Sequence, residues 1–107
     1  MKSTWQKGRI LENEVEKIYQ NAGYLTWKPQ KMKFASQDVL EIADIVATCP
    51  EEFVLVAVST RDAQRKTLDK IFRVLPHLPE SIIVRYYISR QLKSGRKLEV
   101  REWKGQA

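Results

Sequence analysis

Cysteine, histidine, glycine and proline are all scarce in this sequence, whose 107 residues include one Cys, one His, four Gly and four Pro. A single cysteine excludes an internal disulfide framework and fits a reducing intracellular environment, the cytoplasm or the nucleoid. One cysteine and one histidine also argue against a zinc finger. The low Gly and Pro content excludes a collagen-like or low-complexity chain.

Long hydrophobic runs are absent as well. No apolar run approaches the roughly 20 residues that a membrane-spanning helix requires. The N-terminal stretch MKSTWQKGR lacks the apolar segment of a signal peptide. We therefore expect no membrane partner.

Positive charge, in contrast, is abundant. The chain has 19 Lys and Arg against 13 Asp and Glu, which gives a net charge of +6 at pH 7. In a small domain this balance favours a polyanionic partner, although a solvated basic surface has the same composition. A chain of this length suits a single domain, which we expect to span residues 1–107.

The first part of the chain predicts a helix over residues 8–22, followed by a short strand over 24–27. Gly23 is placed to end the helix. Residues 28–41 have no clean period and predict a long loop. The helical residues with apolar side chains on one face are Leu11, Val15, Ile18 and Ala22.

The remainder predicts a hairpin, a helix and a second hairpin. Strands are expected over 43–48 and 53–59, and the apolar run of the second indicates burial on both faces. Asp62 is placed to cap a helix running to about residue 75, with Leu68, Ile71, Phe72 and Leu75 as its apolar stripe. Strands over 81–89 and 98–103 are joined by a turn at Ser94-Gly95.

This pattern predicts an α/β fold with the element order α-β-β-β-α-β-β, and helices flanking a central mixed sheet of about five strands. Its informative part is the first hairpin. Asp44 opens one strand, within Ala43-Asp44-Ile45-Val46-Ala47, and the next strand ends in Ala57-Val58-Ser59. Because strand side chains alternate between faces, Leu55, Ala57 and Ser59 share one side of the sheet.

These residues, with Lys7-Gly8 and Glu12 before them, resemble the archaeal Holliday junction resolvases of the PD-(D/E)xK nuclease superfamily. The resemblance covers about 90 residues from Lys7 and implies a restriction-endonuclease-like core. In that family a helix Glu, a strand Asp and a Glu-Val-Lys triplet hold Mg²⁺ and activate water. Here Ala57 and Ser59 stand at the Glu and Lys positions of the triplet.

The resemblance therefore implies a vestigial catalytic site at Glu12, Asp44, Ala57 and Ser59, with Asp44 and Glu12 as the remaining candidate metal ligands. Glu14 is a second acid on the same helix. An alanine methyl cannot ligate a metal ion, and a serine cannot supply a cation. Substitutes for the lost groups are sought among Glu41, Glu51, Arg61, Lys66 and Lys70.

Candidate DNA-binding cations form two groups around this position, with Lys7 at the start of the first helix in addition. The residues are Lys7; Lys28, Lys31 and Lys33 in the long loop; and Arg61, Arg65 and Lys66 after the third strand. Phosphate contacts would bind DNA without reading its sequence. Trp5, Trp27 and Trp103 are expected to pack in or around the core; the alternatives are a stacking platform for exposed bases and a dimer contact.

Three functions follow as hypotheses. The first is a basic domain of DNA recombination and repair that binds duplex or branched DNA, has lost nuclease activity and needs no cofactor. The second is an active endonuclease with relocated catalytic residues and a Mg²⁺ or Mn²⁺ cofactor. The third is a non-enzymatic interaction or structural subunit. The resemblance implies a homodimer, because resolvases act as two-fold dimers.

Overall fold

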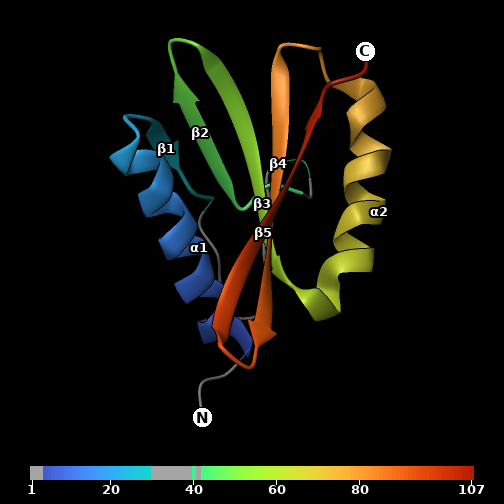
Figure 1. Cartoon of the computed structure of the whole chain (residues 1–107). Helices are drawn as coiled ribbons and strands as arrows, with labels where there is room; N and C mark the ends of the chain where they lie inside the picture. The colour runs from blue at the N-terminus through green and yellow to red at the C-terminus, as the bar shows by residue number, and fades with distance from the viewer. Residues whose placement is uncertain (1–3, 30–39, 41) are drawn as a thin grey trace.

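The chain folds around one mixed sheet with a helix on each face (Figure 1). The computed structural model describes residues 4–29, 40 and 42–107, and the side chains of all of these except residues 4–9, 91 and 92. Its elements, with two 3₁₀ turns η1 and η2, are α1 (Thr4–Asn21), β1 (Leu25–Trp27), β2 (Ile45–Cys49), β3 (Glu52–Thr60), η1 (Arg61–Ala63), α2 (Gln64–Val74), η2 (Leu75–His77), β4 (Ile82–Leu92) and β5 (Gly95–Lys104). The expected α/β class and five-stranded mixed sheet are confirmed.

The strands lie in the order β1-β2-β3-β4-β5. Neighbours pair antiparallel except β3 and β4, which run parallel. A parallel pair needs a long crossover, and η1, α2 and η2 supply it. The crossover explains why α2 covers the face of the sheet opposite to α1.

β3 is the centre of the sheet and is buried on both faces, as its apolar run predicts. Val54 and Val56 face α1, whereas Leu55 and Ala57 face α2. The α1-side core comprises Val15, Tyr19, Ile45, Ala47, Val54, Val56 and Tyr87. The α2-side core comprises Ile42, Ala43, Leu55, Ala57, Ile71, Leu75, Leu78, Val84, Tyr86 and Ile88.

The apolar face of α1 differs from the prediction in its second half. Leu11 and Val15 are buried as expected, but the next buried residue is Tyr19, while Ile18 is 46% exposed. Packing therefore follows a four-residue step, because the Tyr19 ring reaches the core and its hydroxyl finds a hydrogen-bond partner there. Gly23 ends the helix with a φ of 91°, as predicted.

The start of α2 corrects the predicted cap and places Arg61, a proposed substitute, outside the strand. Asp62 does not cap the helix: it lies in η1, and the N-cap residue is Ala63, which makes no side-chain capping bond. β3 ends at Thr60, so Arg61 begins η1 and does not continue the strand face of Ala57 and Ser59. The helix begins only once the 3₁₀ turn has redirected the chain.

Other departures concern the apolar stripe of α2 and the last turn. Ile71 is buried, but Phe72 is 51% exposed and packs edge-to-face on Trp103, with ring centroids 5.5 Å apart. This contact confirms the expected rim packing of Trp103. The last hairpin turns at Lys93 and Ser94, one residue earlier than predicted, because β5 already begins at Gly95. No helix in the described part of the chain is long and apolar enough to cross a membrane.

Candidate functional site

Asp44 lies at the bend that leads into β2 and is 8% exposed. Its backbone N–H donates to Val56 O, and its carboxylate Oδ2 accepts the backbone N–H of Val58, both at 2.8 Å. The ladder between β2 and β3 ends at the pair Ile45 and Val56, and β3 continues beyond it. The N–H of Val58 therefore lies outside the regular ladder with β2. The Asp44 carboxylate supplies the acceptor that this N–H needs when it is partly buried.

Ala57 occupies the position where the resemblance places a catalytic carboxylate. It is 1% exposed, belongs to the α2-side core, and lies directly across the ladder from Tyr86 on β4. Tyr86 is fully buried. Its ring and the methyl group of Ala57 belong to one apolar cluster, and neither supplies an ionisable carboxylate.

Ser59 occupies the position where the resemblance places a lysine, and its hydroxyl is hydrogen-bonded to two groups. Ser59 Oγ donates to Thr60 O at 2.9 Å, and it is also hydrogen-bonded to Tyr86 Oη. Because the single serine proton points to Thr60, Tyr86 is the donor in the second bond. A neutral, mutually satisfied hydroxyl pair thus stands at this position.

Glu12 is the helix acid that the structure buries, at 8% exposed, whereas Glu14 is half-buried and pairs with Arg96 of β5. α1 covers the sheet face that carries Val54 and Val56, opposite to the face of Ala57. Ala57 and the helix that carries Glu12 therefore lie on opposite sides of the sheet, and Asp44 lies at the bend beside β3.

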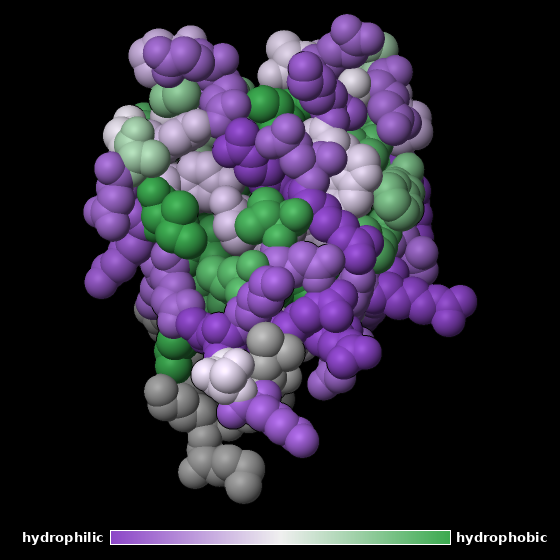
Figure 2. Space-filling view, viewed as in Figure 1, coloured by the Kyte–Doolittle hydropathy of each residue, from purple (hydrophilic) through white to green (hydrophobic). Residues whose placement is uncertain are grey.

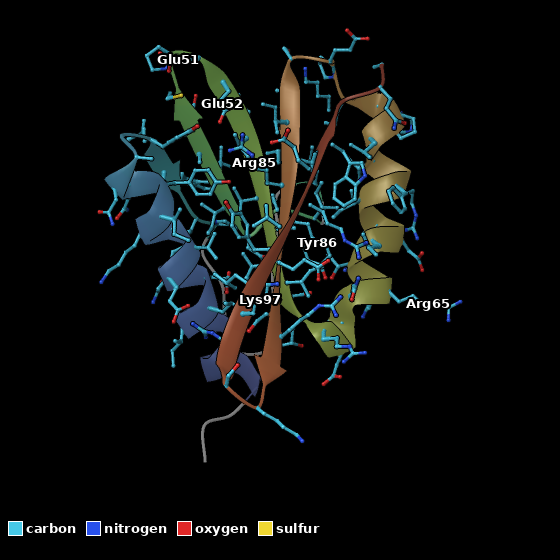
Figure 3. All side chains as sticks on the ribbon, in the orientation of Figure 1. Glu51, Glu52, Arg65, Arg85, Tyr86 and Lys97 are labelled. Carbon is cyan, nitrogen blue, oxygen red and sulfur yellow. The ribbon has the colours of Figure 1, made fainter. Side chains whose placement is uncertain are left out.

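Mg²⁺ prefers several oxygen ligands. Among the described side chains, no group of three His, Cys, Asp or Glu residues gathers closely enough to hold such an ion. One oxygen of Asp44 already accepts the Val58 N–H. Glu41, a proposed substitute, lies outside the described residues, and Glu51 lies at the far tip of the β2–β3 hairpin (Figure 3).

Of the candidate DNA-binding cations, Arg61, Arg65 and Lys66 are exposed and follow β3 directly. No ion pair within the described part of the chain engages these three. Lys70, on the same helix, is half-buried. Lys28 differs: its ammonium lies 3.6 Å from Glu16 and also bonds Asn13 on α1. Lys31, Lys33 and the side chain of Lys7 lie outside what the structure describes.

A network around Arg85 was not predicted from the sequence. Arg85 Nη1 lies 3.0 Å from Glu52 Oε1, Nη2 donates to Glu52 Oε2 at 3.2 Å, and Nε donates to Glu102 at 2.6 Å (Figure 3). Tyr24 donates to the same Glu52 carboxylate. The available signal was Arg85 itself, the only charged residue between Ser81 and Ser89.

The network links Tyr24, the residue before β1, with β3, β4 and β5, and it shifts the pKa values of Glu52 and Tyr24. The hydrogen bond from Tyr24, followed by the charge of Arg85, lowers the pKa of Glu52 against the opposing effect of burial. The same hydrogen bond, with burial, raises the pKa of Tyr24 to about 12. Tyr87 Oη donates to Tyr19 Oη at 2.9 Å and extends the polar contacts to α1. The carboxylates of Glu52 and Glu102 balance the positive charge of Arg85, and these contacts hold the strands together.

The described geometry thus combines a structural carboxylate, two neutral positions and an exposed cationic turn. No protein-family model matches the chain, and no curated protein matches it either.

Proposed function

We propose that this protein is a DNA-binding domain, similar to a Holliday junction resolvase, that has lost metal-dependent nuclease chemistry. The observation that carries the proposal is the cationic turn: Arg61, Arg65 and Lys66 are exposed directly after the strand that ends in Ala57 and Ser59. Guanidinium and ammonium groups of this kind bind phosphate oxygens, and Arg does so with a planar fork of donors.

The loss of chemistry is supported by the contacts of the vestigial positions. Ala57 is packed against the α2-side core, Ser59 is bonded to Tyr86, and Asp44 accepts a backbone N–H. Hydrolysis of a phosphodiester needs a metal-bound or otherwise activated water. None of these three residues offers that activation in the arrangement described.

Binding is expected to follow the DNA backbone. Phosphate contacts carry no sequence information. Two duplexes, or two branched DNAs, that have the same shape and different sequences should therefore bind with the same affinity. Each phosphate contact releases counterions, and the logarithm of the affinity should therefore fall linearly with the logarithm of the salt concentration. From this binding mode and the resemblance, we propose that the protein acts in DNA recombination or repair inside the cell.

A homodimer is part of the proposal. Figure 2 shows hydrophobic residues gathered between α1 and β5 within a mostly hydrophilic surface. Among the exposed large hydrophobic residues, Ile18 belongs to α1 and Val100 to β5, at 46% and 50% exposure. Contiguous apolar surface on a small domain often marks a protein contact. Sedimentation velocity at several protein concentrations tests this part.

The test of DNA binding is one mobility and cleavage series with a four-way junction, plain duplex and single strand, each in EDTA, Mg²⁺ and Mn²⁺. We expect binding without cleavage in every metal condition. Replacing Arg61, Arg65 and Lys66 together by Ala should weaken binding about tenfold or more at low salt and reduce the salt slope. Replacing Lys17, Arg73 and Lys104 together, three exposed cations elsewhere, removes the same charge and is the matched control.

Other outcomes would contradict the proposal in different ways. Absence of binding to any DNA at low salt would remove it and leave the interaction-subunit hypothesis. Metal-dependent cleavage that disappears in Asp44→Ala would favour the endonuclease with relocated residues. In that case Lys66, Lys70 and Glu41 would be substituted next.

A further inference from the structure

Edge strand β1 exposes a tryptophan that belongs to neither core. Trp27 is 57% exposed and Leu25, two residues before it, is 75% exposed. β1 forms the edge of the sheet away from β5 (Figure 1). A large aromatic side chain usually contributes to stability by burial. Because more than half of the Trp27 side chain is exposed, it gains little stability from burial. This differs from the packing role that the sequence predicted.

The backbone around Trp27 is firmly anchored. Thr26 Oγ1 donates to Glu16 at 2.9 Å and accepts from Gln20 at 3.0 Å, both on α1. Lys28 pairs with Glu16 as well. Since strand side chains alternate, contacts of Thr26 and Lys28 with α1 turn Trp27 to the opposite face of the sheet. The indole is therefore presented outward from a strand that is held on both sides of it.

The pairing register places Trp27 beside the candidate site. Trp27 lies opposite Val46, which lies opposite Leu55. Val46 packs against the α2-side core, so Trp27 shares the sheet face of Ala57. From strand spacing, its backbone lies about 12 Å from that of Ala57, two strands across and two residues along.

We infer that Trp27 is a stacking platform for an unpaired base of the bound DNA, at the edge of the phosphate-binding surface. The inference rests on the proposed DNA binding and gives that function its substrate class, DNA with single-stranded or splayed bases. Every base offers a π-face, so stacking on an exposed indole needs no particular sequence. The negative charge of Glu16, which contacts this strand, is balanced by its ion pair with Lys28. The net charge of +6 on the chain favours the approach of DNA.

A second copy of the chain fits this face less well. The exposed large apolar residues contributed by strands β1 and β3 to this face are Leu25, Trp27 and Phe53. A standard protein interface uses about 20 to 30 residues from each side. Three side chains fall far short of that number, whereas the single indole of Trp27 is enough to stack on one base.

The test compares a forked duplex with splayed single-stranded arms, carrying 2-aminopurine in one arm, with a fully paired duplex of equal length. Stacking should quench the 2-aminopurine fluorescence on binding. We expect Trp27→Ala to weaken binding of the fork about tenfold, to abolish the quenching, and to leave duplex affinity and the salt slope unchanged. Trp27→Phe should retain most of the fork affinity. Leu25→Ala, on the same strand and face, is the matched control and should behave as wild type.

Each contrary result has a separate meaning. Failure of the wild-type protein to bind either DNA at low salt would overturn the proposed function itself. If wild type binds the duplex, but wild type and Trp27→Ala bind the fork with equal affinity, only the stacking inference is overturned. A dimer that dissociates in Trp27→Ala, seen by sedimentation, would assign this face to a second copy and also overturn it. Circular dichroism of the variant excludes loss of folding as the cause.

Discussion

The carboxylate of Asp44 accepts the backbone N–H of Val58 at 2.8 Å, at the point where β3 runs past the regular ladder of β2. A side chain thus completes the hydrogen bonding of a strand whose neighbour has ended. This contact gives the acid a structural role that does not depend on any metal ion or on bound DNA.

Substituting Asp44 should therefore lower stability even in the absence of ligand. Asp44→Ala leaves the Val58 N–H with no acceptor from this side chain and should cost about 1–3 kcal/mol. Asp44→Asn keeps an acceptor oxygen without the charge and should cost less. Urea denaturation at pH 7 measures both, and equal stability of Asp44→Ala and wild type would contradict the capping role.

Ala57 and Ser59 should respond differently to restoration of the residues that the resemblance implies. Ala57→Glu forces a carboxylate into the fully packed α2-side core opposite Tyr86, at a cost of about 3–5 kcal/mol. Ser59 is only half-buried, so a lysine there can carry its ammonium to solvent, and Ser59→Lys should change stability by about 1 kcal/mol at most. Thermal unfolding of both variants makes the comparison, and an Ala57→Glu protein as stable as wild type would contradict it.

The lowered pKa of Glu52 predicts a specific acid sensitivity. A carboxyl group whose folded pKa lies below its unfolded value of 4.5 stabilises the fold above that pH. This contribution is lost as the pH falls through the folded pKa, because protonation breaks the pairing with Arg85 and Tyr24. At pH 7 the urea midpoint of wild type should be higher than that of Glu52→Gln. The two midpoints should converge when they are measured in steps below pH 4.5. A constant difference between the two proteins down to the lowest pH would disprove the coupling.

The phenol of Tyr24 provides a spectroscopic test of the same contact. Its pKa is raised to about 12 from the usual 10, first by the hydrogen bond to Glu52 and then by burial. With Glu52 ionised, the bond therefore stabilises the fold fully up to pH 10, and this contribution disappears as the pH rises through 12. Alkaline titration at 295 nm should show a late tyrosine step in wild type that moves towards pH 10 in Glu52→Gln. Tyr24→Phe should remove the step and identifies it.

The elements themselves were largely predictable, because their signals are local. A continuous apolar run defines β3, Gly23 ends α1, and a basic helix follows the third strand. The errors lay at positions where tertiary contacts override a local rule. Asp62 is a good capping residue but the chain first makes a 3₁₀ turn, and Tyr19 takes the place of Ile18 because only its longer side chain reaches a buried partner.

The candidate site was predictable in part. The residue types at Ala57 and Ser59 already showed that neither position carries a carboxylate or a cation, since this follows from chemistry alone. That Tyr86 bonds Ser59, or that Arg85 holds Glu52, could not be read from the chain. These pairs lie 27 and 33 residues apart in sequence and meet only through the register of β3 with β4.

By itself the sequence determined a small basic domain, its alternation of helices and strands, the double burial of β3 and the uncharged side chains at positions 57 and 59. Composition and periodicity suffice for these properties, because each depends on a residue and its near neighbours. Only the tertiary structure decided that Asp44 caps a strand, that Arg85 is neutralised and that Trp27 faces solvent. Each of these depends on strand register and on which helix covers which face, and both are set by the packing of distant segments.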